Sequence, residues 1–152
     1  MAGNDACGDG VGRQSYDFEM TRYVIDAPTL LHLVAEGVEV NPEHQLVAPN
    51  TIRSQALSLL LAGVRQGDIT EAVALQRHER FTELKMRLLG DRVSRRTAWR
   101  IAMENGWETT SDAEYLAVAK LQADALVTID AELATKADGV VPLAPIEALS
   151  AG

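Results

Sequence analysis

Residues 125–130, ALVTID, form an apolar run with β-branched residues that ends on a carboxylate. A short apolar run of this kind predicts a buried strand, and a carboxylate at the end of a buried strand is costly to desolvate without a partner. A second run, RYVID at residues 22–26, ends on Asp26 in the same way. The rest of the chain must therefore supply partners for Asp26 and Asp130.

Segments with the apolar spacing of helices separate the candidate strands. We expect strands at 22–26, 45–49, 125–130 and 140–143. We expect helices at 28–37, 50 to about 63, 68–89, 95–106, 113–123 and 131–137. The strands are apolar on both sides, which is typical of a parallel sheet covered by helices on both faces. The sequence predicts one α/β domain over residues 21–152, after a disordered N-terminal extension at residues 1–20.

Polar residues mark the expected starts of three of these helices. Asp68 with Glu71, and Ser111 with Glu114, have the three-residue spacing of a capping box. Ser94 is placed to cap the helix that follows it. We therefore expect these helices to begin next to Asp68, Ser94 and Ser111.

The composition is that of a globular protein. A chain of 152 residues, 47% apolar and 24% charged, can build one hydrophobic core without disulfides or structural metal ions. Its single cysteine, Cys7, excludes a disulfide framework and a CxxC metal knuckle. The first twenty residues lack the apolar block of a signal peptide, and no stretch approaches the roughly 18 apolar residues of a membrane span. We therefore expect a cytoplasmic protein.

Charge is unevenly distributed along the chain. The net charge of −8 argues against a protein that coats nucleic acid by bulk electrostatics. Residues 77–100 nevertheless hold eight arginines and lysines against three acids, which leaves −13 on the remainder. This basic stretch fits either a solvated helical face or a surface that binds phosphate.

Acidic residues are expected to meet at one edge of the sheet. Ligands of open α/β sheets bind beyond the carboxyl ends of the strands, where Asp26 and Asp130 lie. Asp112 is in the first turn of the helix that leads into the second of these strands. Carboxylates brought together repel unless a cation joins them, and Mg²⁺ or Mn²⁺ prefers oxygen ligands. This pattern predicts metal-assisted hydrolysis of a phosphodiester, although each acid could instead cap or favour a helix start.

Two aromatic residues leave alternatives open. Trp99 and Trp107 could stack on the bases of single-stranded RNA. An aromatic residue at helical spacing is more often part of a core. The sequence does not decide between these roles.

The stretches YVIDAPTLL (23–31) and TSDAEYLAVAKLQADALVTIDAELA (110–134), with a helical region between them, resemble the PIN domain, most closely the VapC-type toxins of bacterial toxin–antitoxin pairs. The resemblance covers about residues 22–143. It implies a three-layer sandwich with a central parallel sheet and an acidic pocket that holds Mg²⁺ or Mn²⁺ for endonucleolytic cleavage of RNA. It also implies a homodimer and a small antitoxin partner that covers the site.

Matched by position, the resemblance assigns the metal-binding and catalytic acids to Asp26, Asp112 and Asp130, with Thr128 as a supporting hydroxyl. Gln55 stands where the family usually has a glutamate, and it keeps the size and one acceptor oxygen but not the charge. Pro28 stands where a small polar residue is usual, with Thr29 one position later.

The sequence therefore supports two functional hypotheses. The first is a metal-dependent endoribonuclease that acts as the toxin of a toxin–antitoxin pair. The second, motivated by Gln55, is a catalytically impaired PIN-like scaffold that binds RNA or a protein partner. A phosphoryl-transfer enzyme with Asp26 as nucleophile is a third interpretation, but the following Ala-Pro-Thr lacks the second aspartate of such sites.

Overall fold

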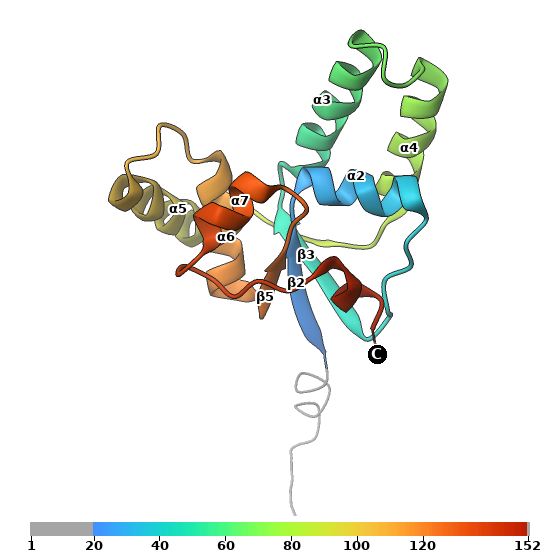
Figure 1. Ribbon diagram of the computed structural model, residues 1–152. Helices are drawn as coiled ribbons and strands as arrows, with labels where there is room; N and C mark the ends of the chain where they lie inside the picture. The colour runs from blue at the N-terminus through green and yellow to red at the C-terminus, as the bar shows by residue number, and fades with distance from the viewer. Residues whose placement is uncertain (1–19, 152) are drawn as a thin grey trace, which may run out of the picture.

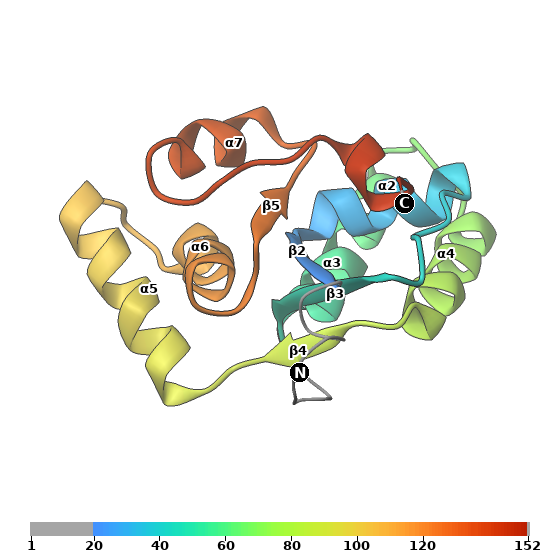
Figure 2. The ribbon, with the colours of Figure 1, turned by 90° about the horizontal axis from the view of Figure 1, so that it is seen from below.

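The computed structural model describes residues 20–151, so the predicted N-terminal extension lies outside the described residues except for Met20. Four parallel strands form one sheet in the order β4-β3-β2-β5, with β2 and β3 at its centre (Figure 1 and Figure 2). The strands are β2 (Thr21–Ile25), β3 (His44–Pro49), β4 (Arg87–Leu89) and β5 (Ala125–Val127).

Helices cover both faces of this sheet. Figure 2 shows α5 and α6 on one side of the sheet and α2 and α4 on the other. The helices are α2 (Ala27–Glu36), α3 (Ile52–Arg65), α4 (Glu71–Glu83), α5 (Arg92–Asn105), α6 (Ser111–Gln122) and α7 (Ala131–Ala137), followed by a 3-10 turn, η1 (Ile146–Leu149). The predicted three-layer α/β architecture with a central parallel sheet is confirmed. None of the described helices is long and apolar enough to cross a membrane.

The register of the sheet fixes where its core and its functional edge lie. Val24 of β2 is opposite Val47 of β3 on one side and Leu126 of β5 on the other, and all three side chains are fully buried. Burial of apolar side chains on both faces explains why the strands lack an alternating pattern. Because β2 and β5 are adjacent and parallel, the residues that follow them meet at the same edge.

The region after α3 differs from the prediction. The helix expected to reach residue 89 ends at Glu83, and the three-residue strand β4 follows. The side chain that caps α4 is Thr70, not Asp68, because the Thr70 hydroxyl accepts a hydrogen bond from the Val73 N–H at 3.2 Å. The prediction missed β4 because so short a strand carries almost no periodic signal.

Two more helix starts and the C-terminal region also differ from the prediction. Asp91, not Ser94, caps α5, and its carboxylate accepts from the Ser94 N–H at 2.8 Å. The N-cap of α6 is Thr110, whose hydroxyl donates to Glu114 at 3.1 Å. The expected strand at 140–143 is reduced to one bridge between Leu126 and Leu143.

Candidate functional site

A cleft of about 370 Å³ opens at the carboxyl edge of the sheet, beside the ends of β2 and β5. Four of the five predicted site residues line it, namely Asp26, Asp112, Asp130 and Gln55, and the fifth is Thr128. The remaining lining residues are Ala27, Pro28, Ser58, Leu59, Ser111, Tyr115 and Leu133. Topology explains this gathering, because α2, α3, α6 and α7 all begin at this edge.

Asp26 is the buried acid of the cleft, with only 3% of its surface exposed. The Thr128 hydroxyl donates to Asp26 Oδ2 at 2.7 Å, and both the hydroxyl and the backbone N–H of Thr29 donate to Oδ1. Burial raises the pKa of Asp26 above its ordinary value, and the hydrogen bonds from Thr29 and Thr128 partly oppose that rise. The threonines therefore favour the ionised form of a carboxylate that burial disfavours.

The two threonine hydroxyls also tie the end of β5 to the start of α2. Thr29 Oγ1 accepts from the Ile129 N–H at 3.0 Å, and Thr128 Oγ1 accepts from the Asp130 N–H at 3.0 Å. Each hydroxyl thus donates to Asp26 and accepts from the segment that carries Asp130. The resemblance predicts Thr128 as a supporting hydroxyl, but it does not predict the matching role of Thr29.

Both strand-end acids also cap helices. Asp26 is the N-cap of α2, and Asp130 is the N-cap of α7 through a 2.9 Å hydrogen bond from the Glu132 N–H. The capping alternative raised for these two residues is therefore correct as a description of their local role. It does not remove them from the cleft, because each carboxylate still lines it.

Asp112 makes an ion pair that the sequence did not predict. Lys136 Nζ, near the end of α7, lies 2.8 Å from Asp112 Oδ2, and both side chains are about one-third exposed. The same ammonium lies 5.1 Å from the centre of the Trp107 ring. The hydrogen bond that Lys136 donates to Asp112 raises the pKa of Lys136, so this lysine is a cation at neutral pH.

Gln55 is held by a buried tyrosine. The Tyr115 hydroxyl donates to Gln55 Oε1, and Tyr115 is only 3% exposed. Burial, followed by the nearby charges of Asp26, Glu114 and Asp112, raises the pKa of Tyr115, which keeps the phenol neutral. Tyr115 lies three residues after Asp112 on the same face of α6, so helical spacing could have identified it.

The cleft offers oxygen ligands but does not yet gather them around one point. No group of three His, Cys, Asp or Glu side chains in residues 20–151 is placed to hold a metal ion. Asp112 is turned to Lys136, and Asp130 accepts from the start of α7. The carboxylate and amide oxygens of the cleft are suitable ligands for a hard divalent ion. Asp112 could join such a site only after its ion pair with Lys136 breaks.

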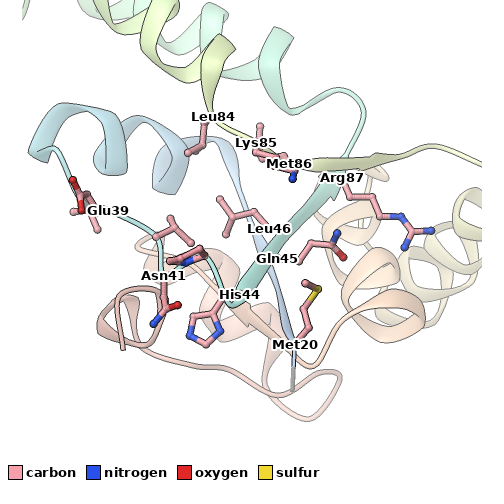
Figure 3. Close-up of a pocket in the computed structure, with 13 residues that line it drawn as sticks. Met20, Glu39, Asn41, His44, Gln45, Leu46, Leu84, Lys85, Met86 and Arg87 are labelled. Atoms are coloured by element: carbon pink, nitrogen blue, oxygen red, sulfur yellow. The ribbon is translucent and has the colours of Figure 1, made fainter. Parts of the chain in front are cut away.

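A larger cavity of about 750 Å³ lies at the opposite end of the sheet, beside the amino ends of β2 and β3 (Figure 3). Its walls are mostly apolar, with Lys85 and Arg87 on one side and His44 at its base. His44 Nε2 bonds to the Ala151 carbonyl at 2.6 Å. Among residues 20–151, Glu39 is the one acid that lines it, whereas three aspartates line the cleft.

The basic stretch is not the face of one helix. Its members are spread over the second half of α4, the segment around β4 and the exposed side of α5. On α5, Trp99 and Met103 are 64% and 66% exposed beside arginines, so Trp99 is not a core residue. Trp107 is partly buried against the core.

A parallel sheet in this order, flanked by helices and with acids at its carboxyl edge, is a PIN/VapC-like fold. The crystal structure of PAE2754 from Pyrobaculum aerophilum matches with a TM-score of 0.66 and 26% identity, over 86% of this chain and 94% of that chain. The structure of VapBC-1 from nontypeable Haemophilus influenzae matches with a TM-score of 0.55 and 15% identity, over 82% of this chain and 98% of that chain, which concerns the fold alone. Comparison with protein-family models and with curated proteins finds no match.

Proposed function

We propose that the protein is a metal-dependent endoribonuclease of the PIN class and the toxin of a toxin–antitoxin pair. The observation that carries this proposal is the cleft at the carboxyl edge, which Asp26, Asp112 and Asp130 all line. Carboxylates that share a cleft repel one another. Within residues 20–151 only Asp112 of the three has a cation bonded to it, so the cleft favours a further cation.

The three carboxylates would hold Mg²⁺ or Mn²⁺, with Gln55 able to offer one neutral oxygen. Such an ion neutralises developing charge on a phosphodiester and activates water for its hydrolysis. Asp26 is the rigid member of the set, because both of its oxygens are fixed by threonines. Asp112 is on the rim and about one-third exposed, so it can turn between partners.

RNA is the substrate class that the charge distribution supports. Four arginines of α5, a helix of 14 residues, lie on its exposed side around Trp99. Arginine contacts phosphate, and an exposed aromatic ring can stack on an unpaired base. In this proposal α5 binds the RNA strand outside the cleft, while the carboxylates act on one phosphodiester.

The likeness to VapBC-1 and the exposed apolar residues support protein partners. Leu57, Leu61 and Leu75, on α3 and α4, are 45%, 57% and 55% exposed. Leu57 and Leu61 lie one helical turn apart on α3, so they share one face of it, and an exposed apolar patch marks an interface. We propose that a small antitoxin protein and a second copy of this chain are the partners of the toxin.

The test is cleavage of a single-stranded RNA with Mg²⁺ or Mn²⁺ by the wild type, Asp26→Asn and the control Asp68→Asn. Asp68 is an exposed acid in the turn before α4 and does not line the cleft. We expect Asp26→Asn to lose at least about 100-fold in rate and Asp68→Asn to retain the wild-type rate. Equal rates for the wild type and Asp26→Asn would refute the assignment.

The scaffold alternative rests on Gln55, which removes one negative charge from the cleft. It predicts that a folded protein binds RNA or a protein partner but no divalent ion. Isothermal titration with Mn²⁺, together with a melting curve as a folding control, separates the two functions.

A further inference from the structure

Lys136 connects the end of α7 to the start of α6. Its ammonium contacts Asp112 Oδ2 at 2.8 Å, across 24 residues of sequence. Among the residues that the structure describes, this is the one ion pair formed by side chains. It involves one of the three acids of the cleft, and the other two, Asp26 and Asp130, have no cation bonded to them in the described part of the chain.

The lysine is oriented from a second side by Trp107, whose ring centre is 5.1 Å from the ammonium. An aromatic ring attracts a cation held over its face. Trp107 is itself partly buried against the core in the loop before α6. Asp112 and Trp107 therefore hold the ammonium at the rim of the cleft, whereas a surface lysine without such contacts would rotate freely.

An ammonium in this position occupies one of the two oxygens that Asp112 could offer to a divalent ion. Asp112 Oδ2 cannot accept a short hydrogen bond from Lys136 and coordinate a metal along the same direction. Within residues 20–151 no three acids converge on one point, and Asp112 is the one of the three cleft acids that is paired with α7.

We infer that Lys136 is a resident counter-ion of Asp112 that competes with the divalent ion of the cleft. The inference rests on the proposed function, because it concerns the same metal site. Without an ion, Lys136 neutralises one of three neighbouring carboxylates. With an ion, Asp112 exchanges the lysine for the metal, and Lys136 leaves both Asp112 and the Trp107 ring.

The first measurement is Mn²⁺ affinity by isothermal titration for the wild type, Lys136→Met and Lys120→Met, without RNA. Methionine keeps a long apolar stem and removes the charge. Lys120 is a matched control, since it is exposed on the last turn of α6 and lies outside the cleft. We expect Lys136→Met to bind Mn²⁺ about fivefold more tightly, as removal of a partly exposed competing ion pair implies, and Lys120→Met to match the wild type.

The second measurement follows the lysine itself. The chain has two tryptophans, so Trp99→Phe leaves Trp107 as the only one. In that background, Mn²⁺ should change the Trp107 emission with the same midpoint as the calorimetric titration. The combined variant Trp99→Phe with Lys136→Met should show a smaller change, because no ammonium leaves the ring. A melting curve of each variant without ion verifies that it is folded.

The outcomes separate the inference from the proposed function. Mn²⁺ binding with equal affinity in the wild type and Lys136→Met would overturn the competition while leaving the metal site in place. Weaker binding by folded Lys136→Met would also overturn it, because Lys136 would then position Asp112 for the metal. Absence of Mn²⁺ binding in both proteins would overturn the metal site and the competition together.

Discussion

Replacing Thr128 by valine tests whether the threonine hydroxyl stabilises the ionised form of Asp26. Valine keeps the shape of the side chain and removes one oxygen. That oxygen donates to Asp26 Oδ2 at 2.7 Å and accepts from the Asp130 N–H at 3.0 Å. A hydrogen bond to a charged group contributes about 1.5–3 kcal/mol, and one between neutral groups contributes about 1 kcal/mol.

The Asp130 N–H is near the open cleft and can bond to water in the variant, so the bond to Asp26 dominates. We expect Thr128→Val to lower the free energy of unfolding by about 2 kcal/mol at neutral pH. For a domain of this size, the melting temperature falls by about 8 °C. Thr135→Val is the control, because that exposed hydroxyl bonds only within α7, and it should change stability by less than about 0.5 kcal/mol.

The pH dependence distinguishes this mechanism from a general packing defect. Burial already raises the pKa of Asp26, and loss of the Thr128 hydrogen bond raises it further. The destabilisation by Thr128→Val is therefore largest where Asp26 is ionised, and it shrinks as the pH falls through the pKa of Asp26. Urea unfolding followed by circular dichroism across this range measures it. A destabilisation that is independent of pH, or smaller than that of the control, would refute the reasoning.

Two further predictions concern the charge of the cleft. Gln55→Glu should strengthen Mn²⁺ binding by about tenfold, because it adds a fourth carboxylate to the cleft and the Tyr115 hydroxyl can still donate to it. The control Gln76→Glu, on the exposed face of α4, should leave the Mn²⁺ affinity unchanged. Equal Mn²⁺ affinities of the wild type and Gln55→Glu in calorimetry would contradict this role for position 55. The pKa of Asp26 is higher in the folded chain than its ordinary value of 3.8, so its contribution to stability is greatest below that value and is lost as the pH rises through the folded pKa. Urea unfolding of the wild type and Asp26→Asn at about pH 4 and pH 7 should therefore show the variant gaining stability relative to the wild type as the pH rises, and a constant difference would contradict the raised pKa.

The sequence predicts the strands that carry the acids because their signals are local. The runs before Asp26 and Asp130 are apolar throughout, and β2 and β5 occupy most of those runs. The strand β4 was missed because it has only three residues, Arg87–Leu89, which are too few to show the period of a strand. Its pairing with β3 is a tertiary contact that the local pattern does not contain.

The same distinction applies to the site. Parallel topology places Asp26, Asp112 and Asp130 at one edge, so their meeting could be predicted. The side chains that bond to Asp112 and Gln55 are set by tertiary packing. Helical spacing places Tyr115 on the face of α6 that carries Asp112, but it does not pair Tyr115 with Gln55. Lys136 is 24 residues from Asp112, and Tyr115 is 60 residues from Gln55.

Capping and catalysis are compatible roles for the strand-end acids. As N-caps of α2 and α7, Asp26 and Asp130 are oriented by backbone N–H groups that the helices provide in any case. The capping bond uses one oxygen of each carboxylate, and on Asp130 the other oxygen is left for a ligand. Loss of an N-cap costs about 0.5–2 kcal/mol for alanine, whereas asparagine caps as well as aspartate does. An Asp→Ala variant would therefore confuse a weakened helix start with a lost ligand, and only the Asp→Asn variants test the charge while keeping the cap.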